Sequence, residues 1–286
     1  MSELPDHTEY LSGDAGQIVG PRLRTRATLA DLALNARAAL ARTGRRLDRL
    51  AERAPRREVL VLSVYRPGSR LPRAVEKLRS ARHDVRFAFG ATSQEADPAL
   101  AADTLLTGLG GGKFENLNRL LEAGGGIEDW VIVVDDDVEL APRFLDRFIA
   151  ICEALELDLA QPAQTSLSHA AWAVTRRRPG LARITSFVEI GPVTAFSRRA
   201  AEQFLPFPEL RFGWGLDNHW AALARERGWT LGVIDALPVR HEWQQIATTY
   251  THAEAIQESR EFLAGKPYVT RAEAQRTLQV IGRVPG

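Results

Sequence analysis

The possible folds of this chain are narrowed chiefly by five apolar residues, Trp130–Val134, that end directly in three aspartates, Asp135, Asp136 and Asp137. A short, β-branched run with no polar position is typical of a strand buried on both faces of a sheet. Ligands of open α/β sheets bind just beyond the carboxyl ends of the strands. The segment therefore predicts a central strand that delivers acidic side chains to a binding site.

Strand-like and helix-like segments alternate around this run. Glu58–Tyr65 and Asp84–Phe89 have strand patterns, whereas Leu71–Ala81, Lys113–Ala123 and Pro142–Leu157 have helical ones. This order implies an α/β fold with a mainly parallel sheet that helices cover on both faces.

The segment before the first strand differs from the rest in charge. Residues 1–21 are acidic and are expected to form a flexible tail, whereas residues 22–57 carry eleven arginines against Asp31, Asp48 and Glu52. Between Thr25 and Glu52 small and apolar residues follow a heptad spacing, which predicts one basic helical arm. The seam consists of Leu29, Ala33, Ala36, Leu40, Thr43, Leu47 and Leu50.

Three roles are open for this arm. It can pack on the main domain, form a homodimer with a second copy, or lie as a basic amphipathic helix on an anionic membrane surface. The net charge of the chain is only +1, so no nucleic-acid partner is expected. We expect three parts: the tail and arm over 1–57, a catalytic domain over 58–250, and a helical extension over 251–286.

Cysteine content and hydropathy indicate the compartment. A single cysteine, Cys152, excludes an intrachain disulfide and favours a reducing environment. The first twenty residues are polar, unlike a signal peptide, and no run approaches the roughly 20 apolar residues that span a bilayer. The sequence therefore predicts a cytoplasmic protein, with peripheral membrane association as a further option.

The three aspartates themselves point to a cation. Adjacent carboxylates repel one another, and a divalent cation relieves the repulsion. Mg²⁺ and Mn²⁺ prefer oxygen ligands and often keep diphosphate oxygens as partners. If the strand geometry persists, Asp135 and Asp137 share a face. The alternative is a solvated acidic turn before the helix near Pro142, and nucleotidyltransferases and phosphatases also carry acids at such a position.

A glycine-rich segment, GLGGGKFENLN at 108–118, precedes the aspartates. It is not a P-loop, because Thr107 and Phe114 stand where glycine and serine or threonine are required. Lys113 at a helix start would suit a diphosphate, although a solvated surface charge is the alternative. The end of the first strand should also face a nucleotide, which makes Tyr65 and Arg66 candidates for base and phosphate contacts.

A second set of motifs carries a family resemblance. FVEIGPVTAFSRR, GWGLD and GVIDALPVRH follow the aspartates between residues 187 and 241. With the aspartates and the G-K-x-x-x-L-N segment, they resemble GT-A glycosyltransferases, particularly the large family-two group. The FVEI…FSR and GWGLD pieces are still closer to an uncharacterised glycosyltransferase-like group. The resemblance covers roughly 58–243 and implies a GT-A, Rossmann-like fold.

The resemblance also implies an activity, which is metal-dependent transfer of a sugar from a UDP- or GDP-sugar donor to the hydroxyl of an unknown acceptor. Asp217, at a helix start, would be the general base of an inverting reaction, and Trp214 and Glu189 would contact the acceptor. The metal, Mn²⁺ or Mg²⁺, would bind Asp137, Asp135 and His241. The donor would contact Tyr65, Arg66, Lys113, Asn118, Asp135 and Asp136.

The sequence departs from the family pattern at two points. The usual Glu-Asp pair is Leu216-Asp217 here, and FAFGATSQEAD lacks the acid that binds uracil in many relatives, so the base is open. Asp217 could instead cap its helix, Trp214 could be buried, and His241 could be structural. The alternative functions are a nucleotidyltransferase or other phosphoryl-transfer enzyme, and a non-catalytic scaffold that binds sugar nucleotides.

Overall fold

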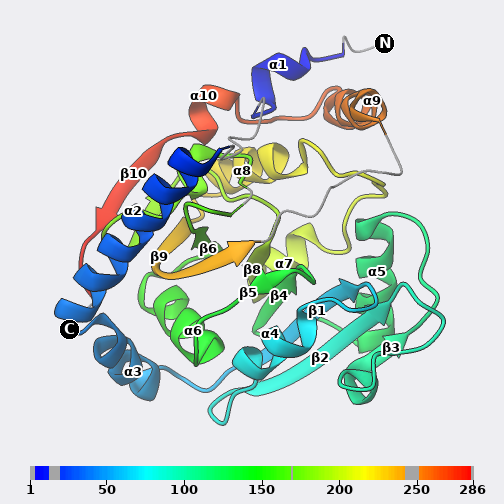
Figure 1. Ribbon diagram of the computed structural model, residues 1–286. Coiled ribbons are helices and arrows are strands. Elements are labelled where there is room, and N and C mark those ends of the chain that lie inside the picture. The colour runs from blue at the N-terminus through cyan, green and yellow to red at the C-terminus, as the bar shows by residue number, and fades with distance from the viewer. Residues whose placement is uncertain (1–3, 13–19, 169, 242–250, 285–286) are drawn as a thin grey trace.

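A computed structural model describes residues 4–12, 20–168, 170–241 and 251–284. These residues contain ten strands: β1 (Glu58–Tyr65), β2 (Asp84–Ala91), β3 (Thr104–Leu106), β4 (Trp130–Val134), β5 (Val138–Glu139), β6 (Leu159–Gln164), β7 (Ala182–Thr185), β8 (Val193–Ser197), β9 (Leu231–His241) and β10 (Thr277–Ile281). The main sheet has the order β10-β7-β9-β6-β8-β4-β1-β2-β3, and β5 pairs with β9 (Figure 1).

Most strands of this order point the same way. β1 is parallel to β2 and β4, β2 to β3, and β6 to β9. β7 and β8 run antiparallel to their neighbours, which reverses them relative to the rest. The mainly parallel, mixed α/β sheet that the alternating pattern predicts is confirmed.

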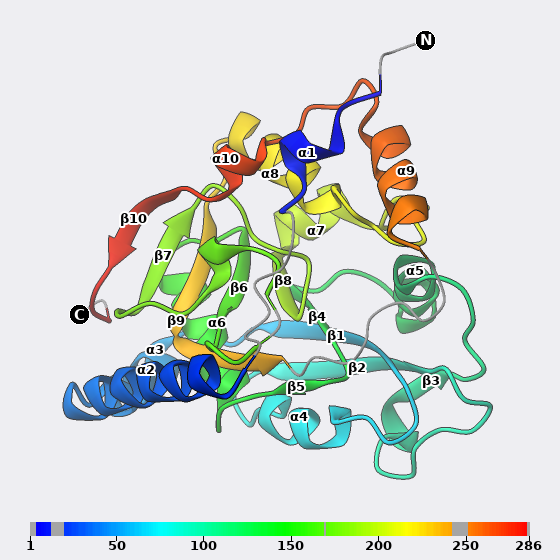
Figure 2. The same cartoon turned by 45° about the horizontal axis from the view of Figure 1, so that its top comes forward.

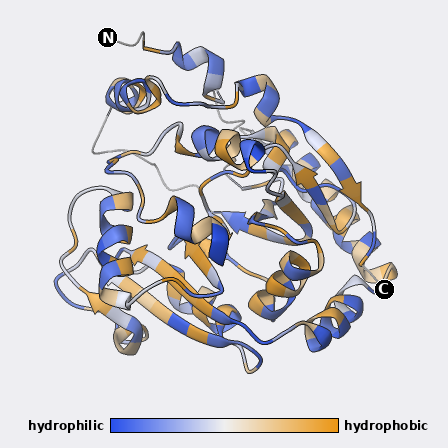
Figure 3. Ribbon diagram, turned by 180° about the vertical axis from the view of Figure 1, so that it is seen from behind, coloured by the Kyte–Doolittle hydropathy of each residue, from blue (hydrophilic) through white to orange (hydrophobic). Residues whose placement is uncertain are grey.

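The helices are α1 (His7–Tyr10), α2 (Pro21–Leu40), α3 (Thr43–Arg53), α4 (Leu71–Leu78), α5 (Lys113–Gly124), α6 (Phe144–Ala154), α7 (Arg198–Phe204), α8 (Leu216–Glu226), α9 (His252–Leu263) and α10 (Arg271–Ala274). Alternate residues of β1 enter different cores, because strand side chains point to opposite faces. Val59 and Val61 pack with α4 and α6, and Leu60 and Leu62 with α5, α7 and α8. Figure 2 shows α4 and α7 on opposite sides of β1, and Figure 3 shows apolar residues concentrated along the strands and on the inner helix faces.

The basic arm is not one helix, and that prediction is wrong. The chain leaves helical geometry at Arg42, whose φ of 53° is left-handed, and Gly44, a weak helix former, follows. Only the second half of the seam is buried: Leu47 packs into the core with α6. On α2, Leu29 is 61% exposed and Leu40 is 86% exposed. The homodimer and membrane roles of the arm stay predictions.

The two ends of the chain also differ from expectation. Residues 1–3 and 13–19 of the acidic tail lie outside the described residues, as do residues 242–250 near the expected domain boundary. Within the tail, Tyr10 is fully buried, and its hydroxyl lies 2.8 Å from that of Ser259 on α9. The extension over 251–286 is not helical throughout, since β10 pairs with β7 and lengthens the sheet. Among the described residues, no helix is both long enough and apolar enough to cross a bilayer.

Candidate functional site

Two carboxylates and an imidazole converge where β4 ends. Asp135 and Asp137 follow β4, and the antiparallel pairing of β5 with β9 sets His241 opposite Val138, the residue after Asp137. The Nε2 atom of His241 is 3.1 Å from an oxygen of Asp137 and 3.9 Å from one of Asp135. Ligand atoms from all three residues lie within 4.8 Å of one another. The structure therefore brings together the three residues predicted to hold a metal.

This group can hold a divalent ion. Ligands on opposite sides of Mg²⁺ or Mn²⁺ are roughly 4 to 4.5 Å apart, since each metal–oxygen distance is about 2.0–2.2 Å. The separations from His241 Nε2 to Asp137 and Asp135, 3.1 and 3.9 Å, lie within that span. Carboxylates suit Mg²⁺ and Mn²⁺, while imidazole suits several first-row transition metals, so the mixed set is compatible with a divalent ion and does not select one.

The middle aspartate has a different role. Asp136 is nearly buried, and its carboxylate accepts hydrogen bonds from Nε and from the backbone N–H of Arg66, both at 2.9 Å. Its backbone carbonyl accepts one from Arg70 N–H at 2.8 Å. Asp136 thus ties the carboxyl end of β1 to that of β4. The ion pair with Asp136 also raises the pKa of Arg66, and both residues are already engaged with each other.

Lys113 reaches the metal group from α5. Its ammonium pairs with Asp135, and Gly112, directly before it, donates its N–H to Glu115 in the first turn. Gly191 packs over this pair with a left-handed φ of 122°, where a Cβ atom would lie 3.1 Å from an Asp135 oxygen. The close backbone approach fixes the Lys113–Asp135 pair beside the candidate metal position.

Two acids with raised pKa values lie beside this group. Loss of hydration raises the pKa of Asp217 to about 7, although Asn218 N–H donates a 3.0 Å hydrogen bond to it. Loss of hydration, with repulsion from Asp217 as a smaller cause, raises the pKa of Glu189 to about 8, while His241 opposes the shift. Glu189 accepts hydrogen bonds from Gln164 at 3.0 Å and from Thr175 at 3.3 Å. The charges of Asp217 and His241 thus act on the Glu189 carboxyl in opposite directions, Asp217 raising its pKa and His241 lowering it.

The remaining residues that were predicted to contact the sugar-nucleotide donor, Tyr65 and Asn118, make hydrogen bonds within the protein. The Tyr65 ring is buried in the core, and its hydroxyl lies 2.9 Å from that of Thr104 and accepts a bond from Asp97 N–H. The Asn118 side chain both donates to and accepts from the backbone of Phe207, at 2.9 and 2.8 Å. These bonds stabilise the fold around Tyr65 and Asn118. A contact of either residue with the sugar-nucleotide donor stays a prediction.

Trp214 lies on a loop with an ordered shape. Gly213 and Gly215 have left-handed φ values of 74° and 81°, and the ring of Trp214 is partly accessible. Glu258 on α9 restrains this loop, because its carboxylate accepts the N–H groups of residues 211, 212 and 213 at 2.7 to 3.0 Å. Sequence reasoning missed Glu258, because the contact spans more than forty residues and no local pattern marks it.

No family model matches the chain, and no curated protein matches it. Solved structures that the chain matches include a Pyrobaculum calidifontis mannosyltransferase with GDP-Man and Mn²⁺, at 16% identity, TM-score 0.47, covering 82% of this chain and 72% of that one. S. aureus TarS with UDP-GlcNAc gives 13% identity, TM-score 0.48 and coverages of 71% and 64%. GalNAc-T7 with UDP, GalNAc and Mn²⁺ gives 12% identity, TM-score 0.49 and coverages of 84% and 55%. Similarity at this level does not identify a function.

Proposed function

We propose that this chain is a GT-A glycosyltransferase, which moves a sugar from a nucleoside diphosphate sugar to an acceptor hydroxyl. The proposal rests on one observation, the convergence of Asp135, Asp137 and His241 beyond β4, next to the acids Asp217 and Glu189. Transfer from a diphosphate leaving group requires a cation site with a proton-accepting group nearby.

The donor half of the site is the metal group with Lys113. A bound Mn²⁺ or Mg²⁺ supplies Lewis-acid neutralisation of the diphosphate. Lys113 adds a fixed positive charge on the same side, because its ammonium already lies against Asp135. The N-terminal turn of α5, which Lys113 begins, presents backbone N–H groups in the same region. UDP-sugars and GDP-sugars both fit this chemistry.

The acceptor half consists of Asp217 and Glu189. A pKa of about 7 leaves Asp217 about half ionised at neutral pH, which suits a general base for a hydroxyl proton. Glu189, with a pKa of about 8, stays mostly protonated there and can donate a hydrogen bond to the acceptor. With one carboxylate base and no covalent nucleophile, the reaction inverts the anomeric centre. Trp214 offers a ring face to the acceptor from the neighbouring loop.

The first test measures donor turnover. Purified protein is incubated with a panel of UDP- and GDP-sugars with and without Mn²⁺, and released nucleoside diphosphate is quantified. We expect slow, Mn²⁺-dependent release of UDP or GDP from one donor. Release of pyrophosphate would indicate a nucleotidyltransferase instead, and tight donor binding with no release would indicate a scaffold.

The second test removes a metal ligand. We expect Asp137→Ala to weaken Mn²⁺ binding at least about tenfold in calorimetric titration and to abolish turnover. Glu139→Gln is the matched control, since Glu139 is an exposed carboxylate two residues along the chain. Equal Mn²⁺ affinity in Asp137→Ala and the control would refute the metal assignment.

A further inference from the structure

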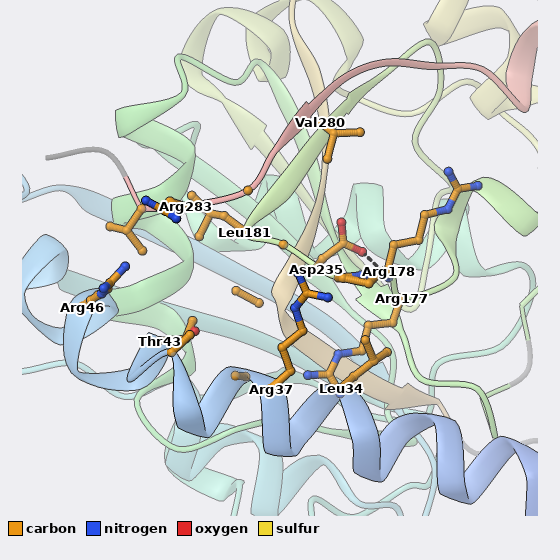
Figure 4. Close-up of a pocket in the computed structure, with 17 residues that line it drawn as sticks. Leu34, Arg37, Thr43, Arg46, Arg177, Arg178, Leu181, Asp235, Val280 and Arg283 are labelled. Atoms are coloured by element: carbon orange, nitrogen blue, oxygen red, sulfur yellow. Dashed lines mark hydrogen bonds between the residues drawn. The ribbon is translucent and has the colours of Figure 1, made fainter.

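A pocket lies away from the aspartates, between the arm and the carboxyl-terminal segment. Its volume is about 620 Å³, within the range of roughly 300–1,000 Å³ typical of small-molecule sites. Figure 4 shows its walls: α2 and the start of α3, the loop after Arg176, the middle of β9, and the end of β10. Segments that are distant in sequence thus enclose one space.

The walls of this pocket are strongly basic. Five arginines line it, against one acid, Asp235. The arginines are Arg37, Arg46, Arg177, Arg178 and Arg283. Asp235 does not offset them, because its carboxylate accepts bonds from Arg183 Nε at 2.8 Å and from the backbone N–H of Arg178 at 2.7 Å. Arg183 lies behind the pocket wall and is fully buried. The space therefore carries an excess of positive charge.

Three of these guanidinium groups are available to a ligand. Within the described residues, Arg37, Arg46 and Arg283 make no ion pair and no side-chain hydrogen bond. Figure 4 shows the Arg37 side chain rising from α2 toward Asp235, while Arg46 and Arg283 project from α3 and from the segment after β10. Arg177 donates one hydrogen bond to Asn35 at 2.7 Å, and loss of hydration lowers its pKa. The pocket arginines outnumber the acidic groups that act on them, which for Arg177 are Asp31 and Asp235.

We propose that this pocket is a second ligand site, which takes an organic phosphate bearing at least two negative charges. Guanidinium groups bind phosphate oxygens in a bidentate manner, which favours phosphate over a simple carboxylate. Apolar side chains complete the wall, and they suit a non-polar part of the ligand: Leu34, Leu181, Val280 and Val284. The lining favours a phosphate group as the ligand. This group can belong to a free metabolite or to a lipid headgroup.

This pocket is separate from the metal group. Asp235 precedes His241 by six residues on β9, which is about 20 Å of extended strand. A donor diphosphate held at the aspartates does not span that distance together with its own sugar and base contacts. The inference is therefore independent of the proposed glycosyl transfer. Because α2, α3 and the segment after β10 all line this space, an anion here would contact both the arm and the body.

The test uses inorganic pyrophosphate as the probe, in calorimetric titration with EDTA present, so that no divalent ion can recruit the probe to the aspartates. We expect saturable binding, and we expect Arg37→Gln/Arg283→Gln to weaken it at least about tenfold, because charge-assisted hydrogen bonds are lost. Arg49→Gln/Arg119→Gln, two exposed arginines outside the pocket, is the matched control and should bind within about twofold of the original protein.

The outcomes separate clearly. No saturable binding at millimolar pyrophosphate, or equal affinity in the pocket variant and its control, would overturn the proposal. The four substituted side chains are all exposed, so folding is expected to survive, and circular dichroism checks it. Co-sedimentation with vesicles of phosphatidylcholine with or without phosphatidic acid then identifies the source. Sedimentation that requires phosphatidic acid and Arg37 with Arg283 supports a lipid headgroup; pyrophosphate binding without sedimentation supports a free phosphate ester.

Discussion

Replacing Asp217 with asparagine should make the folded protein more stable at alkaline pH while it removes the general base. In the native state the pKa of Asp217 lies near 7, against 3.8 for an unperturbed aspartate. Between these two values the native carboxyl keeps a proton that the unfolded chain has released. Stability therefore falls as pH rises from about 4 to about 7, and the loss is complete above pH 7. The full effect is roughly 4 kcal/mol.

An amide cannot ionise, so Asp217→Asn escapes this loss. From pH 5 to pH 8 the original protein should lose about 2–3 kcal/mol that the variant keeps. The amide oxygen can still accept the Asn218 N–H, so the first turn of α8 is retained. Urea unfolding in EDTA at pH 5 and pH 8 measures the difference. Glu226→Gln, at the exposed far end of α8, is the control and should show no comparable gain.

The rate of turnover should fall in Asp217→Asn, whereas its stability at alkaline pH should rise. Loss of a general base typically costs about 10²–10⁴-fold in rate, so the variant is expected to be more stable and nearly inactive. Equal stability changes at pH 5 and pH 8 would show that Asp217 ionises normally, and the assignment of the base would lose its physical support.

Three further changes test other parts of the structure. Arg183→Met should destabilise the protein by about 3–5 kcal/mol in urea unfolding, since it leaves Asp235 buried without its partner; a loss below about 1 kcal/mol would contradict this. Gly213→Ala should cut turnover and lower Tm, because a Cβ there would lie 1.9 Å from the Phe114 ring at a left-handed φ; unchanged values would mean that the loop can move freely. Arg66→Gln should cost about 1–3 kcal/mol by leaving the Asp136 carboxylate short of donors, and an unaltered urea midpoint would argue against that anchor.

The elements that the sequence predicted well are those with local signals. Glu58–Tyr65 and Trp130–Val134 are strands with the predicted bounds, because their apolar runs are long enough to require burial on both faces. The sequence also placed Asp135 and Asp137 on one side of the chain. Their meeting with His241 depended on a family resemblance, since the β5–β9 pairing that joins them crosses about one hundred residues.

The elements that the sequence missed are stabilised by distant partners. β6 (LAQPAQ) contains two glutamines and a proline, a poor strand pattern, yet all six residues are buried. Gln161 accepts Glu189 N–H, and Gln164 donates to the Glu189 side chain, so each amide is bonded through one polar atom to a segment some 25 residues away, while Gln161 Nε2 and Gln164 Oε1 find no partner among the described residues. The restraint on the Trp214 loop by Glu258 also arises from a tertiary contact, which no local spacing reveals.

β10 forms one edge of the main sheet and pairs with the backbone of β7. It covers the outer side of β7, whose other side pairs with β9. A shortened protein that ended before Thr277 would expose a row of unpaired backbone donors and acceptors on β7, a template onto which a strand of another molecule could add. Such a truncation should therefore aggregate at protein concentrations where the aspartate group, at the opposite end of β9, is still intact.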